Sequence, residues 1–182
     1  YLAWAAARDA EADERAWRAG LAGLEGPTLI APGAAEQPPA EPGSVAVELD
    51  PDLAAVLTAT ARRLDVTVPT VVQALWALVL AGLTGRQDVV FGSTVSGRPA
   101  ELPGVESMVG LFINTVPIRV RLRYEETLAA LIGRLQAEQA ALLPHHHLGL
   151  GDIQRIGGVG PLFDTLAVFE NYLVEGAEDA AG

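Results

Sequence analysis

Hydrophobic residues recur at helical spacing in three stretches of the chain. Apolar positions among charged residues predict a helix over residues 1–24. Asp50 followed by Pro51 predicts the start of a second helix, whose leucines and valines lie three or four residues apart. The segment 125–143 has the same amphipathic pattern, and Pro144 ends it. Each of these helices has one apolar face available for a core.

A fourth predicted helix differs because it is apolar on almost every side. Thr67 begins it, Pro69 lies in its first turn, and the following run "TVVQALWALVLAGL" contains no charged residue. Gly82 and Gly85 are expected to end it. We therefore expect a buried central helix over 68–83, lying on one face of a sheet.

Four runs have the pattern of β-strands, at 44–49, 88–97, 116–123 and 162–172. In 116–123, apolar residues alternate with proline and arginines, which indicates one buried and one solvated face. Strands that alternate with helices predict an α/β fold, a layered α/β sandwich with helices packed on a mixed sheet. With only about four strands visible, we expect this sheet to be incomplete.

Two segments are predicted to be loops because prolines and glycines interrupt any periodic pattern. Residues 26–43 contain five prolines and form a Pro/Gly-rich loop or linker. Residues 98–110, "RPAELPGVESMVG", form a second loop between two predicted strands.

Composition narrows the functional classes. The 182 residues are half hydrophobic, and the net charge of −11 argues against a nucleic-acid-binding protein. The absence of cysteine excludes disulfides and thiol catalysis. No uncharged apolar run of about 18 residues is present. We expect a cytoplasmic chain, and its start at Tyr1 without methionine suggests a piece of a longer protein.

All three histidines are adjacent, in "LLPHHHLGLGD" from Leu142 to Asp152. Neighbouring side chains on a helix diverge by about 100°, so these rings would not converge on one ion. An extended His145-x-His147 pair would, but only with further ligands. We therefore expect no metal site, and interpret the histidines as a helix terminus, where they interact well with the macrodipole.

Three stretches resemble the condensation domains of nonribosomal peptide synthetases. They are "YLAW" at the start, "DVVFGSTVSGRPAELPGVESMVGLFINTVPIRV" (88–120) and "GVGPLFDTLAVFENY" (158–172). Within the second, "VGLFINTVPIR" (109–119) matches the family's Gly-x-Phe-x-Asn-Thr…Arg motif at each fixed position. The similarity covers nearly the whole chain in unbroken order.

The resemblance implies a fold of two lobes, each similar to chloramphenicol acetyltransferase. Residues 1–182 would form part of the C-terminal lobe, and 98–110 the loop that bridges the lobes as the floor of the substrate tunnel. The family's catalytic signature, His-His-x-x-x-Asp-Gly, belongs to the N-terminal lobe. The segment at His145–His147 matches it in neither register and lies after the Asn-Thr motif, so no catalytic residue is expected in this chain.

The resemblance also suggests roles for individual residues in the tunnel. Asn114 would face it and bind the acceptor or a pantetheine arm, unless it only closes a bulge or turn. Ser93 and Thr94, beside Gly92, would line the acceptor channel, or serve only as strand residues.

Three arginines are candidates for structural ion pairs. Arg98 is expected to fix the loop that follows it. Either Arg62 or Arg63 would pair with the signature aspartate across the lobes, unless both lie on a solvated helix end.

The function implied is amide-bond formation between a donor acyl or peptidyl thioester and an acceptor aminoacyl thioester. Donor and acceptor peptidyl carrier proteins would deliver both on 4'-phosphopantetheine arms, with no other cofactor bound. The missing N-terminal lobe and a neighbouring adenylation domain are the other expected partners, and neither nucleic acid nor membrane is one. The chain alone would be inactive. A non-catalytic docking or recruitment module and an epimerization domain are the alternatives, and "LFDTLAVFENY" favours condensation over epimerization.

Overall fold

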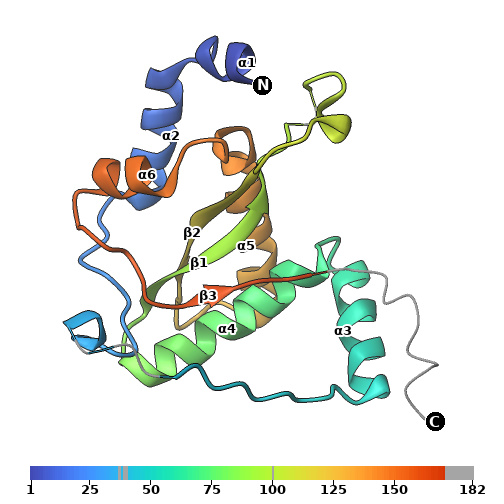
Figure 1. Cartoon of the computed structure of the whole chain (residues 1–182). Coiled ribbons are helices and arrows are strands. Elements are labelled where there is room, and N and C mark those ends of the chain that lie inside the picture. Colours follow the sequence, from blue (N-terminus) through green and yellow to red (C-terminus); the bar gives the residue numbers. More distant parts are fainter. Residues whose placement is uncertain (37, 39–40, 100, 171–182) are drawn as a thin grey trace.

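The computed structural model describes residues 1–36, 38, 41–99 and 101–170. Its centre is a mixed three-stranded sheet in the order β2-β1-β3 (Figure 1). Strand β1 (Asp88–Ser96) pairs antiparallel with β2 (Ile113–Arg121) over its whole length. On its other side β1 pairs parallel with the short β3 (Leu166–Ala167). The layered α/β class predicted from the sequence is confirmed.

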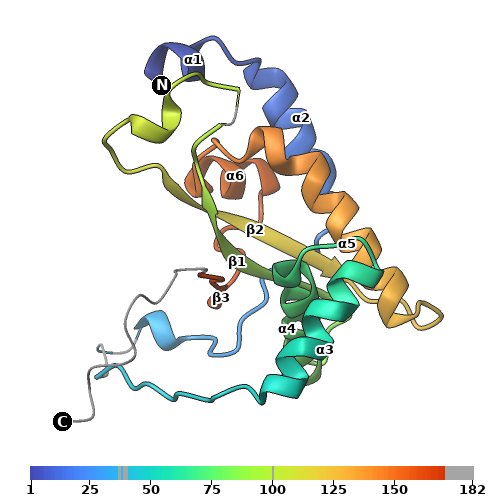
Figure 2. The ribbon, with the colours of Figure 1, turned by 90° about the vertical axis from the view of Figure 1, so that its right-hand side faces the viewer.

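Helices lie on and around the sheet, as Figures 1 and 2 show, and the described residues form six of them. Helix α4 packs on β1, α5 packs on α4, and α6 packs on β2, while α2 contacts both α5 and α6. Their bounds are α1 Leu2–Ala6, α2 Ala10–Leu21, α3 Pro51–Arg63, α4 Val68–Thr84, α5 Leu128–Leu142 and α6 Leu150–Gly157. Three 3₁₀ turns cover Ala34–Glu36, Val105–Ser107 and Leu143–His145.

The helix termini follow the local sequence. The carboxylate of Asp50 accepts a hydrogen bond from the backbone N–H of Asp52, and Pro51 occupies the first turn of α3. The hydroxyl of Thr67 accepts from the backbone N–H of Thr70 at the start of α4. Gly85 ends α4 with a φ of 69°, a conformation that glycine adopts without steric cost. These predicted starts, and the end at Gly85, are confirmed.

The core lies between the sheet and its helices. Its largest fully buried side chains are Trp17, Phe91, Leu80, Ile132, Leu135, Ile153 and Leu162. They come from α2, α4, α5, α6, β1 and the segment before β3, so elements from both ends and the middle of the chain pack into one core.

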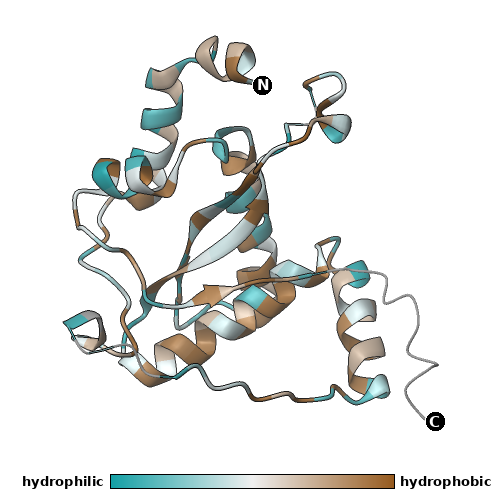
Figure 3. Cartoon of the chain, viewed as in Figure 1, coloured by the Kyte–Doolittle hydropathy of each residue, from teal (hydrophilic) through white to brown (hydrophobic). Residues whose placement is uncertain are grey.

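Two helix predictions need correction. The segment 1–24 forms two helices rather than one, because Asp9 breaks the pattern and caps α2 through a hydrogen bond from Ala12. Helix α4 is not buried on all sides: Figure 3 shows it strongly hydrophobic, yet neighbouring elements cover only part of it. Its exposed large apolar side chains are Val72, Leu75, Leu78, Val79 and Leu83.

Two strand predictions were also wrong in extent. The segment 44–49 is not a strand: Val45 and Val47 are 90% and 84% exposed, and no strand of the described residues pairs with it. In the run 162–172, only Leu166–Ala167 is a strand, and positions 171–172 lie outside the described residues.

Among the residues described, no single helix has the length and apolar character needed to cross a membrane. Helices α3 and α4 meet those criteria only together, as a pair bent by 107°.

Candidate functional site

The ends of β1 and β2 approach closely where the loop 98–110 leaves the sheet. A Cβ atom on Gly97 would lie 2.0 Å from the carbonyl oxygen of Phe112, so only glycine fits there without a backbone shift. The guanidinium of Arg98 lies 4.2 Å from the centre of the Phe112 ring. These contacts close the base of the loop.

Arg98 also holds the interior of the loop. Its Nη2 donates to the carbonyl of Met108 at 2.9 Å, and its Nη1 donates to the carbonyl of Val105. The sequence suggested an ion pair for Arg98; within the described residues its partners are backbone carbonyls and an aromatic face instead. A guanidinium can satisfy two carbonyls at once through its fork of donors, so it orders the loop without a carboxylate.

Thr94 lines a cavity of about 470 Å³ at this end of the sheet, bounded by the loop, the start of β2 and residues 168–170. Ser93 faces the opposite side, because successive side chains of a strand alternate. It is 4% exposed, and the Nε2 of Gln73 on α4 donates to its hydroxyl at 3.0 Å. Of the two residues predicted to line a channel, only Thr94 faces open space in the described structure.

Asn114 lies at the start of β2 and is tied to the histidine segment. Its Nδ2 donates to the carbonyls of His146 at 2.8 Å and Leu148 at 2.7 Å. Its Oδ1 accepts from the backbone N–H of Thr115 at 2.9 Å. Both amide hydrogens are therefore used within the chain, in contacts with a distant segment rather than in closing a bulge or turn. The role of Asn114 in the tunnel stays a prediction.

Replacing Asn114 with alanine is expected to lower the free energy of unfolding by about 2 kcal/mol, because two carbonyls lose their donors. Chemical denaturation of the intact parent domain measures this, beside single-turnover condensation at a temperature where the variant is folded. If stability is unchanged and the rate falls tens to hundreds of fold, Asn114 acts on substrate rather than on the fold.

The carboxylate of Asp13 on α2 holds two of the three histidines. Its Oδ1 lies 2.6 Å from Nδ1 of His145, and its Oδ2 lies 3.0 Å from Nε2 of His147. Asp13 is 3% exposed, and the indole N–H of Trp17 donates to the carbonyl of His145 at 3.1 Å. The segment that follows α5 is therefore joined to α2 by side-chain contacts. The sequence suggested only that these histidines interact with a helix terminus.

His146 points elsewhere and packs on Trp17, with ring centres 6.4 Å apart and planes 26° from parallel. Burial, and secondarily the nearby His145, lower the pKa of His146 from 6.5 to about 4. The ring is therefore neutral near pH 7.

Stability should fall at acidic pH because of His146. Its pKa is lower in the folded chain than in the unfolded chain, so the unfolded chain binds the proton first as the pH decreases. Unfolding free energy is expected to drop between pH 6.5 and about 4, by about 1–2 kcal/mol once solvent access to the ring is allowed for. In His146→Phe this loss of stability at acidic pH should be absent. Urea unfolding of the wild-type domain and of the variant at pH 7, 5.5 and 4 measures the difference. Parallel pH profiles would assign the acid sensitivity to other groups.

The side chain of Arg119, in the Asn-Thr…Arg motif, is largely covered, contrary to the solvated face predicted for its strand. It forms two hydrogen bonds with Asp88 on β1, at 2.9 and 2.6 Å. Its Nη1 donates to the carbonyls of Gly20 and Ala22, at 3.1 and 2.8 Å. The motif arginine therefore connects β1 and β2 to the C-terminal end of α2. Its guanidinium donates to backbone carbonyls that have no hydrogen-bond donor within the helix.

Arg62 and Arg63 lie in the last turn of α3, and both are exposed. Neither makes a side-chain hydrogen bond or ion pair with another described residue. Their pairing across lobes stays a prediction, since the predicted aspartate belongs to another lobe. In the part of the chain that the structure describes, no three His, Asp or Glu side chains are arranged to hold a metal ion.

The sequence profile of the condensation domain matches residues 1–181. The chain belongs to the condensation domain family. Chondramide synthase of Chondromyces crocatus is 41% identical over an alignment of 182 positions, which covers 97% of this chain and 5% of that protein. A linear gramicidin synthase of Brevibacillus parabrevis is 40% identical over an alignment of 181 positions, which covers 96% of this chain and 2% of that protein.

Solved structures show the same fold. The first condensation domain of the calcium-dependent antibiotic synthetase superposes with a TM-score of 0.71 at 24% identity. The alignment covers 92% of this chain and 37% of that one. The chain therefore has the fold of a part of a condensation domain, and it spans a small part of its synthetase relatives.

Proposed function

We propose that this chain is the C-terminal lobe of a condensation domain that forms amide bonds within a nonribosomal peptide synthetase. The observation that carries the proposal is the loop 98–110. It joins the two strands of the family motif, and Arg98 and the close approach at Gly97 tie its beginning to its later part, beside the cavity that Thr94 lines. A loop fixed in this way suits the floor of a tunnel between two lobes.

In the proposed reaction, the acceptor amine attacks the carbonyl carbon of the donor thioester. The new C–N bond forms, the C–S bond breaks, the donor pantetheine thiol leaves, and the amine gives up a proton. The phosphopantetheine arms of two carrier proteins bring both substrates. Asn114, Thr94 and the loop would contribute shape and hydrogen bonding, and the remaining lobe would supply the group that orients the amine or takes its proton.

Exposed apolar side chains beside this cavity support the proposed partner lobe. Val109, Leu111 and Ile113 are all exposed, at the junction of the loop with β2. Phe169 and Val168 lie on the other side of the same cavity and are half exposed. Apolar groups clustered in this way are typical of a surface that another part of the protein covers. A neighbouring adenylation domain and a cytoplasmic location stay predictions.

The proposal is tested with the intact parent domain, incubated with carriers loaded with donor and acceptor and followed by mass spectrometry. We expect the amide product on the acceptor carrier. Inverted stereochemistry at the donor residue without amide formation would indicate an epimerization domain. Carrier binding with neither product would indicate a docking or recruitment module, and either of these results overturns the proposal.

A further inference from the structure

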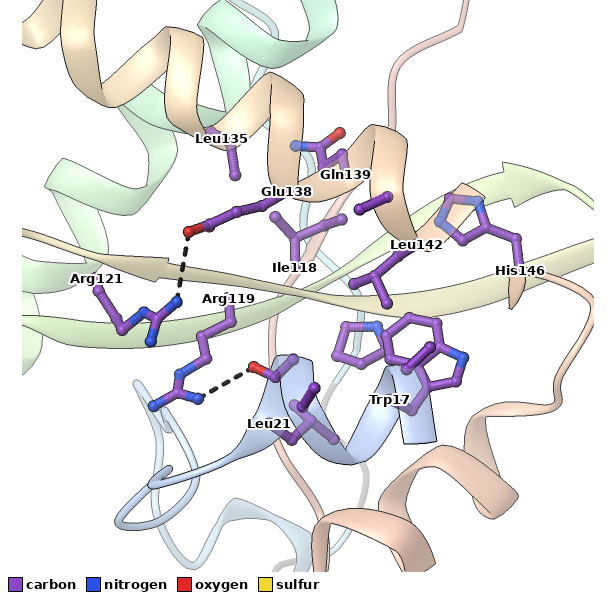
Figure 4. A pocket seen from close by; sticks show the side chains of 15 residues that line it. Trp17, Leu21, Ile118, Arg119, Arg121, Leu135, Glu138, Gln139, Leu142 and His146 are labelled. Carbon is purple, nitrogen blue, oxygen red and sulfur yellow. Dashed lines mark hydrogen bonds and ion pairs between the residues drawn. The ribbon is translucent and has the colours of Figure 1, made fainter. Parts of the chain in front are cut away.

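A second cavity, of about 310 Å³, lies between α2, β2 and α5, away from the loop 98–110. Figure 4 shows Trp17 and Leu21 entering from α2, Ile118 from β2, and Leu135 and Leu142 from α5. The first four of these side chains are buried members of the core. Its size is at the lower end of the range of small-molecule pockets, and its wall is mainly apolar, as such pockets usually are.

The charged groups at this cavity are neutralised by partners. The hydrogen bonds of Arg119 go to Asp88 and to backbone carbonyls of the α2 terminus. Glu138 pairs with Arg121 at 3.4 Å and with Arg134 at 3.2 Å, the first pair being drawn in Figure 4. Since an ion entering the cavity would have to compete with these pairs while losing its hydration, a neutral ligand is favoured.

His146 supplies the hydrogen-bonding group of the cavity. Its ring lines the cavity and stacks on Trp17, and it makes no side-chain hydrogen bond within the described part of the chain. The neutral imidazole described above carries one N–H donor and one bare nitrogen acceptor. Asp13 keeps the neighbouring His145 and His147 engaged, so His146 alone of the three faces this space.

We propose that this cavity binds a neutral, mainly aromatic small molecule that carries one hydrogen-bonding group directed at His146. The apolar wall would cover the ring of the ligand, and Trp17 would pack beside it. This cavity shares no lining side chain with the cavity that Thr94 lines, although the backbone carbonyl of His146 accepts a hydrogen bond from Asn114. The proposal does not rest on amide formation, so either proposal can fail while the other stands.

The test uses ¹⁹F NMR on the intact condensation domain of the parent, with 5-fluoroindole and 4-fluorotoluene as neutral probes and 4-fluorobenzoate as an anionic one. We expect saturable binding of both neutral probes and much weaker binding of 4-fluorobenzoate. Ala16→Leu, which fills the cavity from α2, should abolish binding of the neutral probes. The matched control Ala10→Leu, exposed on the same helix, should leave it unchanged.

His146→Leu separates the two parts of the proposal. It should weaken 5-fluoroindole binding about five- to tenfold, the usual loss for one hydrogen bond. Binding of 4-fluorotoluene, which has no such group, should be unchanged. The proposal is overturned if neither neutral probe binds the intact domain, if Ala16→Leu leaves binding intact in a folded variant, or if 4-fluorobenzoate binds as tightly as 5-fluoroindole. An equal loss of binding affinity for 5-fluoroindole and 4-fluorotoluene in His146→Leu would also overturn the proposal.

Discussion

Replacing Arg119 with methionine is expected to lower the free energy of unfolding by about 3 kcal/mol, the lower end of the cost of removing one partner of a buried ion pair, because the Asp88 carboxylate is partly exposed. The side chain of Arg119 is only 8% exposed, and that of Asp88 is 29% exposed. Methionine would fill part of the volume but would leave the Asp88 carboxylate without its two donors. The carbonyls at the end of α2, on Gly20 and Ala22, would also lose theirs.

Arg121→Met is a closely matched control for this change, since the two arginines are two residues apart on β2. Arg121 is half exposed, and its ion pair with Glu138 at 3.4 Å is open to solvent. Such surface pairs contribute at most about 1 kcal/mol. Urea unfolding of the two variants measures the difference, and similar losses in both would contradict the structural role assigned to Arg119.

Replacing Asp13 with alanine is expected to cost about 3 kcal/mol and to free the segment that follows α5 from α2. The change removes the only carboxylate that His145 and His147 contact among the described residues, and it leaves two ring nitrogens in a largely buried place without acceptors.

Glu14→Ala, one residue later on the same helix, removes an exposed carboxylate paired with Arg18 and should change stability by less than about 1 kcal/mol. Chemical denaturation compares the two variants. Histidine ring NMR signals provide a second measurement, since those of His145 and His147 should shift in Asp13→Ala and stay in place in Glu14→Ala. Unshifted signals in a folded Asp13→Ala domain would show that the carboxylate does not hold these rings in solution.

Most of the fold follows from local sequence. Local signals specify several helices and strands, because they act within a few residues. Examples are the helix caps Asp50 and Thr67, the terminating Gly85 and the alternating strand that ends before Leu122. The segment 44–49 shows the limit of such reasoning. Its alternation fits a strand, but a strand also needs a partner, and none of the described residues supplies one.

The candidate site was less accessible from sequence, because its contacts join distant residues. Asp13 and His145 are 132 residues apart, so neither position indicates the other. Alternation along β1 does distinguish Ser93 from Thr94, because successive side chains of a strand face opposite sides of the sheet. The alternating pattern places Arg119 on the face of β2 opposite to its apolar residues. It does not show that α2 covers this face at Arg119, because that depends on tertiary packing.

We propose that this chain is one lobe of an amide-forming condensation domain, and that the catalytic group lies in the remainder of that domain. The most direct test is to supply loaded donor and acceptor carriers to the chain alone, to the remainder of its domain alone, and to the two together, and to measure amide product by mass spectrometry. We expect amide product only when both parts are present. Product from the chain alone above the protein-free control, or none from the recombined or intact domain, would contradict it.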